Sequence, residues 1–235
     1  MIGVATGREY AGRRYGRGVK VLVFGATGMV GQGVVRECLL AADVESVVAV
    51  GRSSAGVSDP KLREVRRPDL FDLAGVAELS GVDACFFCLG VPSSGMSEAD
   101  YTRVTHDLTL YVASVLDPSA VFVYVSGQGA DRTEKGRVMW ARVRGRTENA
   151  LLDGPLDAYI LRPGYIQPRH GARSKVALYR TMYRVTSVLY PLLRLVLRDH
   201  ITTTETVGRA MLALARGGGA DTRVLNSPEM NALAR

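Results

Sequence analysis

Three glycines spaced three residues apart carry the strongest chemical signal in this sequence. They belong to the run Gly25-Ala-Thr-Gly28-Met-Val-Gly31, which follows a short apolar segment and precedes a helical pattern. Glycine allows a tight turn and a close approach of the backbone to a ligand, and the amide groups at a helix N-terminus attract negative charge. The sequence therefore predicts that this turn binds the pyrophosphate of a dinucleotide. The residues expected to contact it are Gly25, Thr27, Gly28, Met29, Val30 and Gly31.

A second signal lies about twenty residues after the last glycine, where a fold selective for NAD usually offers an Asp or Glu to the adenosine ribose. This sequence has Arg52 and Ser53 there, and no carboxylate. A guanidinium and a hydroxyl bind a phosphate through charge-assisted hydrogen bonds. We therefore expect NADP(H) in preference to NAD(H); the alternative is that Arg52 is a solvated surface residue.

Alternating strands and helices must position these residues. Short β-branched and aromatic runs predict strands at 20–24, 47–50, 62–66, 84–88, 121–125 and 158–161, with a further edge strand near Val224. Helical patterns cover 29–42, 97–116, 133–152 and 204–215, with a shorter one after Asp72. This alternation predicts right-handed βαβ crossovers and an α/β fold with a doubly wound parallel sheet, the Rossmann fold.

One domain accounts for nearly the whole chain. We expect a flexible basic leader at 1–19, followed by a single dinucleotide-binding domain at 20–235 in which 165–203 form a small helical cover over the substrate cleft. The stretch 176–197 is apolar, but three arginines and Pro191 interrupt it, which disfavours a spanning helix. The simplest interpretation is that this stretch packs in the core. The alternatives are that it covers the substrate cleft, forms a dimer face or contacts a membrane surface. A monomer and a homodimer are both compatible with the sequence.

The composition is that of an ordinary globular protein: 47% of the 235 residues are hydrophobic and 23% are charged, which excludes a disordered chain and a disulfide scaffold. The net charge of +7 comes mainly from arginines scattered along the chain, so we expect solvated surface rather than a nucleic-acid site. Three cysteines indicate a reducing compartment and no disulfide; we expect a cytoplasmic protein. Cys85 and Cys88 would point to opposite faces of a strand. His106, His170 and His200 lack metal-ligand spacing, and no metal is predicted.

Four further motifs follow the glycine turn in order: Asp72-Leu73, Cys88-Leu-Gly90, Ser126-Gly-Gln-Gly-Ala-Asp131 and Arg162-Pro-Gly164. With them the chain resembles the atypical short-chain dehydrogenases/reductases, in the branch that includes a small tumour-suppressor protein and bacterial chains labelled as NAD-dependent epimerase/dehydratase. The resemblance implies a sheet of six or seven strands that binds NADP(H), with the substrate in the cleft after the fifth and sixth strands. Further cofactor contacts implied by it are Asp72, Leu73, Cys88, Leu89, Gly90, Arg144, Pro163 and Gly164.

The sequence departs from this family at the residues that transfer a proton. Dehydrogenases of the superfamily use a Tyr-x-x-x-Lys pair, and the matching segment here is Trp140-Ala-Arg-Val-Arg144. An indole does not donate a proton at neutral pH, and an arginine keeps the positive charge without exchanging a proton. Arg144 retains the capacity to bind the nicotinamide ribose, and Ser126 occupies the position expected to orient a substrate carbonyl.

Three functions follow from this departure. The chain is a reductase with another proton donor, a non-redox enzyme such as an isomerase, cyclase or dehydratase, or a cofactor-sensing regulatory protein without catalysis. We favour an oxidoreductase acting on a carbonyl or enone of a small metabolite. Its expected catalytic positions are Ser126, Arg144, Tyr165 and Trp140, the last as the position of the usual Tyr. The candidate proton donors are Tyr165 and Tyr124, with His170 as an alternative acid.

The substrate is expected to be a small molecule. Arg162, Arg169 and Arg173 lie around the loop that follows the Arg-Pro-Gly motif. Their positive charges would attract an anionic substrate, although a solvated surface loop explains them equally well.

Overall fold

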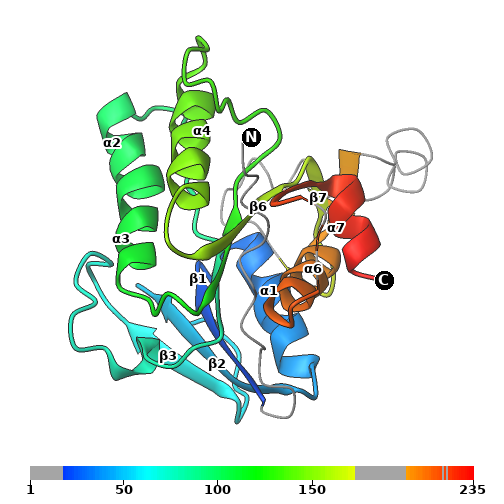
Figure 1. Ribbon diagram of the computed structural model, residues 1–235. Coiled ribbons are helices and arrows are strands. Elements are labelled where there is room, and N and C mark those ends of the chain that lie inside the picture. Colours follow the sequence, from blue (N-terminus) through cyan, green and yellow to red (C-terminus); the bar gives the residue numbers. More distant parts are fainter. Residues whose placement is uncertain (1–17, 173–199, 219, 221) are drawn as a thin grey trace, which may run out of the picture.

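The computed structural model describes residues 18–172, 200–218, 220 and 222–235. Most of the predicted leader 1–19 and the whole apolar stretch 176–197 lie outside the described residues, so the expectations about them stay predictions. The described chain forms a seven-stranded sheet with every strand pair parallel, between two layers of helices (Figure 1). The predicted doubly wound α/β fold is confirmed.

The strand order is β3-β2-β1-β4-β5-β6-β9. Because helices cover both faces, the central strands are continuous apolar runs rather than alternating ones. All four residues of β4 and the first four of β5 are buried. The bounds are β1 Val19–Phe24, β2 Val44–Gly51, β3 Leu62–Arg66, β4 Ala84–Phe87, β5 Val121–Val125, β6 Asp157–Arg162 and β9 Val224–Asn226.

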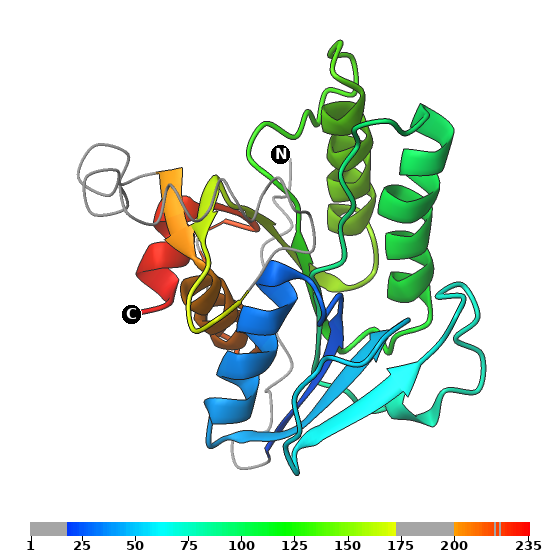
Figure 2. The same cartoon turned by 180° about the vertical axis from the view of Figure 1, so that it is seen from behind.

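Two helical layers enclose separate halves of the core (Figures 1 and 2). The helices α1 Met29–Leu40, α6 Thr204–Ala215 and α7 Ser227–Leu233 cover one face, with α1 packed on α6. The other face carries α2 Glu98–Thr102, a π-helical turn Arg103–Asp107, α3 Leu108–Ser114 and α4 Met139–Leu152, with a short 3₁₀ turn at Ala77–Leu79.

Alternation along β1 supplies both halves of the core. Val21 and Val23 point toward α1 and α6, whereas Leu22 and Phe24 point toward the opposite layer. Each fully buried side chain of this size contributes about 1.5–3 kcal/mol. The sheet is therefore anchored on both faces, and its strand ends are held in fixed positions.

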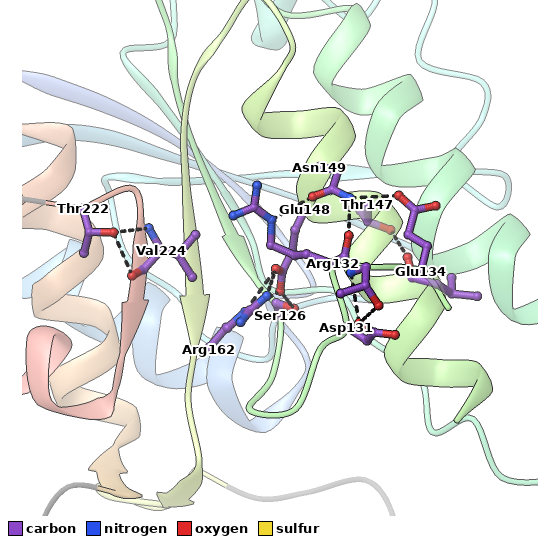
Figure 3. A network of polar contacts seen from close by, with 12 residues as sticks. Ser126, Asp131, Arg132, Glu134, Thr147, Glu148, Asn149, Arg162, Thr222 and Val224 are labelled. Carbon is purple, nitrogen blue, oxygen red and sulfur yellow. Dashed lines mark hydrogen bonds and ion pairs between the residues drawn. The ribbon is translucent and has the colours of Figure 1, made fainter. Parts of the chain in front are cut away.

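The structure differs from the sequence prediction in helix α4. The predicted helix 133–152 begins only at Met139, because the Asp131 carboxylate accepts hydrogen bonds from Thr133 N at 3.0 Å and Gly136 N at 2.7 Å and closes a loop. Asn149 of α4 bonds both Arg132 and Glu134, which holds this loop against the helix (Figure 3).

Other elements were not predicted. They are helix α7 and the small parallel sheet formed by β7 Tyr165–Gln167 and β8 Ile201–Thr203. Three-residue strands give no periodic signal, and their partner lies across a long stretch of chain. The segment 165–203 was expected to be a helical cover, and its first and last residues are the strands β7 and β8.

Within the described parts of the chain, no helix combines the length and apolarity that crossing a membrane would need.

Candidate functional site

The glycine turn joins the end of β1 to the start of α1 and lies against the end of β4. Gly25 has a φ of +82°, and a Cβ at this position would lie 2.7 Å from the carbonyl carbon of Cys88. Gly28 N donates to Gly25 O at 2.9 Å, and a Cβ on Gly31 would overlap the same carbonyl oxygen. Side chains are therefore excluded at Gly25 and Gly31, where the turn packs closely on itself and on the end of β4.

Among the described residues, no side chain caps or neutralises the N-terminus of α1. Gly28 is its N-cap residue, no side chain caps the helix, and its first turn has no acidic residue. By contrast, Ser97 caps α2 and Thr203 caps α6. Free amide groups and the positive end of the helix dipole suit an anionic group such as a pyrophosphate. The residues of the turn thus fit the predicted ligand.

A pair of arginines lies at the neighbouring strand ends. Arg52 and Ser53 are exposed in the loop after β2. Arg67 follows β3, and its backbone N donates to Gly51 O at 3.0 Å, at the end of β2. Its buried Nε has no hydrogen-bond partner among the described residues. A buried donor without an acceptor costs about 1–3 kcal/mol, so a ligand acceptor would stabilise this site.

Sequence reasoning missed Arg67. The dipeptide Arg66-Arg67 at the end of the predicted strand 62–66 was the available signal. Arg66 itself pairs with Glu64 at 3.1 Å. Only the β2–β3 register, which places Gly51 opposite Arg66, brings Arg67 beside the loop that carries Arg52.

Glu64 of β3 is the carboxylate that binds this loop. Glu64 accepts hydrogen bonds from Ser54 Oγ at 2.8 Å and from Ala55 N at 2.7 Å. The Ser54 hydrogen bond, followed by that of Ala55, holds the pKa of Glu64 below its usual value. Glu64 therefore closes the loop that follows Arg52 and stays ionised while doing so.

The remaining expected cofactor residues differ in accessibility. Asp72 is exposed, whereas Leu73 is 3% exposed and donates its backbone N–H to the Tyr111 hydroxyl at 3.1 Å. Leu73 therefore packs in the core beneath its loop. Cys88, Leu89 and Gly90 follow β4 directly, next to Gly25.

The Arg-Pro-Gly motif follows β6 and lies beside the loop that follows β5. Pro163 O accepts from Gln128 N at 3.1 Å, and a Cβ on Gly164 would lie 2.7 Å from Gln128 Oε1. A side chain at Gly164 would therefore not fit between the two loops.

Ser126, Glu148 and Arg162 form a buried polar network (Figure 3). Glu148 is completely buried on α4. It accepts from Ser126 Oγ at 2.5 Å and from Arg162 Nε at 3.0 Å, and it also contacts Arg162 Nη2. Because the Ser126 hydrogen is donated to Glu148, this hydroxyl can only accept a hydrogen bond from a ligand. Arg162 is already neutralised, so its charge is not free to attract an anionic substrate.

Arg144 extends from α4 toward the ends of β4 and β5. A Cβ on Gly127 would lie 3.3 Å from its Nη1, and a Cβ on Gly90 would lie 3.7 Å from its Nη2. Trp140 lies one helical turn away, and its ring would be 3.3 Å from a Cβ on Gly129. Tyr124 is buried next to Arg144; burial raises the pKa of its phenol, and the positive charge of Arg144 acts in the opposite direction.

The candidate proton donors and Ser126 lie in different parts of the structure. Tyr124 and Ser126 lie on β5 and just after it, close to α4, whereas Tyr165 lies in the separate two-stranded sheet and donates to Gln167 Oε1 at 2.9 Å. His170 has a φ of +53° and lies 3.0 Å from Glu205 Oε2. The structure thus brings Tyr124, Ser126 and Arg144 together. Arg173 lies outside the described residues.

The three cysteines are free thiols that pack against the core. Cys85 packs in the core on the α3–α4 face and Cys88 against the α1–α6 face, as predicted. All three cysteines are free thiols, and burial raises their pKa values, which makes them unreactive. In the described part of the chain, no three His, Cys, Asp or Glu side chains are grouped so as to hold a metal ion.

Comparison with known proteins adds the evolutionary context. Residues 21–133 match the model of the NAD dependent epimerase/dehydratase family. The chain is 30% identical over 202 residues to the Aspergillus oryzae protein named "Protein fmp52-2, mitochondrial", with 83% of this chain and 85% of the relative covered. An Aspergillus terreus protein of the same name is 27% identical over 201 residues, with the same coverage.

Solved structures share the fold. A short-chain dehydrogenase/reductase from Saccharomyces cerevisiae aligns with a TM-score of 0.61 at 16% identity, with 92% of this chain and 99% of that chain covered. The enzyme WbmF from Bordetella bronchiseptica, crystallised with NAD+ and UDP, aligns with a TM-score of 0.61 at 16% identity, covering 89% of this chain and 72% of that chain.

The names of the relatives correct one prediction. Both curated relatives are named mitochondrial, which contradicts the cytoplasmic location expected from the sequence. That expectation rested on free cysteines, and these indicate a reducing compartment without identifying which one.

The fold, the open glycine turn and these relatives agree with one another. The family depends on a nicotinamide dinucleotide, and its fold is that of oxidoreductases and epimerases. The chain therefore belongs to the short-chain dehydrogenase/reductase superfamily, as an atypical member related to the NAD dependent epimerase/dehydratase family.

Proposed function

We propose that this protein binds NADP(H) in preference to NAD(H) and reduces a carbonyl or enone group of a small metabolite. The observation that carries the cofactor preference is the pair Arg52 and Arg67. Neither forms an ion pair with a carboxylate among the described residues, and the Nε of Arg67 is buried without an acceptor. A 2′-phosphate would supply that acceptor and offset both positive charges.

The chemistry divides between the cofactor and the chain. Reduced nicotinamide, when bound, supplies a hydride. The glycine turn binds the pyrophosphate, and the terminal nitrogens of Arg144 bind the hydroxyls of the nicotinamide ribose. Tyr124 is the proton donor we favour, because it lies beside Arg144, whose positive charge lowers the pKa of the phenol against the effect of burial. Tyr165 is disfavoured, because its hydroxyl hydrogen is donated to Gln167.

A non-redox reaction on the same fold is the second candidate. Trp140 supports it, because an indole stands where the superfamily's phenol would be and packs over Gly129. In that case the protein is an isomerase, cyclase or dehydratase in which the dinucleotide orients the substrate. A cofactor sensor without catalysis would share the binding residues and lack turnover.

The partner is a small-molecule substrate, and no nucleic acid is involved. Of the arginines expected to attract an anion, Arg162 is paired with Glu148 and Arg169 is exposed. A monomer and a homodimer remain equally open, as does peripheral membrane contact through 176–197, which lies outside the described residues.

The experiment that tests the cofactor preference is Arg52→Asp, with dissociation constants for NADPH and NADH measured by calorimetry. We expect NADPH binding to weaken by about tenfold or more, because a charged hydrogen bond is lost and a like charge is introduced. NADH binding should stay the same or improve. Arg63→Asp, an equal charge change at an exposed position of β3, is the control and should change neither affinity. Equal loss of both nucleotides in Arg52→Asp would refute the assignment.

A further inference from the structure

Tyr101 has a buried phenol group, and the reaction proposed above assigns it no role. It lies on α2, its side chain is 1% exposed, and its hydroxyl accepts a hydrogen bond from Arg144 Nε at 3.0 Å. The two residues come from different helices and are 43 positions apart in the chain. No motif in the sequence connects them.

Among the described residues, the Arg144 guanidinium forms this one hydrogen bond, through Nε. Nε is held by Tyr101, while Nη1 and Nη2 lie near Gly127 and Gly90, at the carboxyl ends of the adjacent strands β5 and β4. Ligands of open parallel sheets bind at this edge. The terminal nitrogens of Arg144 therefore lie at the crevice, while Tyr101 holds the guanidinium through Nε.

Helix α2 holds Tyr101 firmly. Ser97 caps its N-terminus by accepting from Asp100 N at 3.1 Å, and Glu98 pairs with Arg142 of α4 at 2.7 Å. A π-helical turn follows directly at Arg103–Asp107, a geometry that is rare and often found at functional sites. Tyr101 thus approaches Arg144 from a helix that is itself fixed to α4.

We infer that Tyr101 is a positioning residue, whose hydroxyl fixes the Arg144 guanidinium in the orientation that binds the nicotinamide ribose. An arginine side chain has many rotamers, and restricting them before binding increases affinity. Without the phenol hydroxyl, Arg144 would keep its charge and lose its preferred direction. This inference rests on the proposed cofactor site.

The test compares two nucleotides that reach different parts of the site. NADPH spans the whole crevice, whereas adenosine 2′,5′-bisphosphate carries the 2′-phosphate and lacks the nicotinamide ribose. We expect Tyr101→Phe to weaken NADPH binding by about fivefold, the usual effect of one lost hydrogen bond, and to leave the bisphosphate affinity unchanged. A merely structural role would change both affinities or neither.

Two further variants make the outcome decisive. Tyr159→Phe removes a phenol hydroxyl from a residue that packs on the α1–α6 face, and it should leave the affinity for NADPH unchanged. In an Arg144→Leu background, Tyr101→Phe should have no further effect, because its action passes through Arg144. Unchanged NADPH affinity in Tyr101→Phe, equal loss of both nucleotides, or an undiminished effect in the Arg144→Leu background would each overturn the inference.

The same titrations separate this inference from the proposed function. If the unaltered protein binds neither nucleotide, the proposed cofactor site is wrong, and the inference is overturned with it. If it binds both and Tyr101→Phe behaves like the unaltered protein, only the inference is overturned. Circular dichroism of each variant confirms that it is folded.

Discussion

The Ser126 hydroxyl donates to Oε1 of the fully buried Glu148 across 2.5 Å, and Arg162 binds the same carboxylate from β6. This contact ties the ends of β5 and β6 to helix α4, and it uses the serine hydrogen that a substrate carbonyl would otherwise receive. Ser126 is thus part of the framework that holds Arg144 and Tyr124 in place.

Removing Glu148 should destabilise the protein strongly. Glu148→Ala leaves the Arg162 guanidinium, which is only 19% exposed, without its counter-charge, and breaking such a buried pair costs about 3–5 kcal/mol. Urea unfolding of the variant measures this loss. Glu134→Ala, which removes a partly exposed carboxylate from the loop beside α4, should cost less than about 1 kcal/mol. Similar losses in the two variants would contradict a structural role for the buried network.

Gly31→Ala should disrupt the pyrophosphate turn. Its Cβ would overlap the carbonyl oxygen of Gly25, so the turn must shift, at a cost of at least about 2 kcal/mol. We expect a lower melting temperature together with loss of NADPH binding. In Gly51→Ala the nearest atom would be 3.8 Å away, so its stability should change by less than about 1 kcal/mol. A Gly31→Ala protein with an unchanged melting temperature would contradict the close contact between Gly31 and the carbonyl of Gly25.

Trp140→Tyr combined with Arg144→Lys restores the phenol and amine of the superfamily pair, one turn apart on α4. If the nicotinamide and the substrate are placed in this crevice as in other members of the superfamily, the new phenol should raise the rate at which the double variant oxidises NADPH in the presence of small carbonyl compounds. A positioned general acid contributes about 10²-fold or more. The matched control is Trp140→Phe with Arg144→Lys, which has the ring and the amine but no hydroxyl. Equal rates in the two variants would favour the non-redox or sensor function.

Glu205 should make the stability of the protein depend on acidic pH. The hydrogen bond from His170 lowers the pKa of Glu205, and the charge of Arg209 adds to this effect. A carboxylate with a lowered pKa stabilises the folded state above its ordinary pKa, and this stabilisation is lost as the pH falls through the lowered value. Between about pH 5 and pH 3, the unaltered protein should therefore lose more stability than Glu205→Gln.

Because this pair is partly exposed, the difference should stay below about 1 kcal/mol. Urea midpoints at several pH values measure it. Glu78→Gln removes an exposed carboxylate without an ion pair among the described residues, and its pH dependence should match that of the unaltered protein. A Glu205→Gln variant with that same pH dependence would exclude the effect.

Local patterns in the sequence determined the fold class and the pyrophosphate turn. The strands are apolar runs because both faces of a parallel sheet are covered. Gly25 and Gly31 follow the first strand because a Cβ at either position would clash with the backbone. Each of these features depends on neighbours along the chain, so one sequence suffices to predict it.

Only the tertiary structure decided which distant residues meet. The β2–β3 register brings Arg67 beside Arg52, and the packing of α2 on α4 brings Tyr101 to Arg144. Contacts of this kind are set by side-chain packing across the sheet and between helices, so no spacing along the chain encodes them. The sequence by itself predicted the turn at which a dinucleotide would bind, and the folded chain decided which distant side chains lie beside that site.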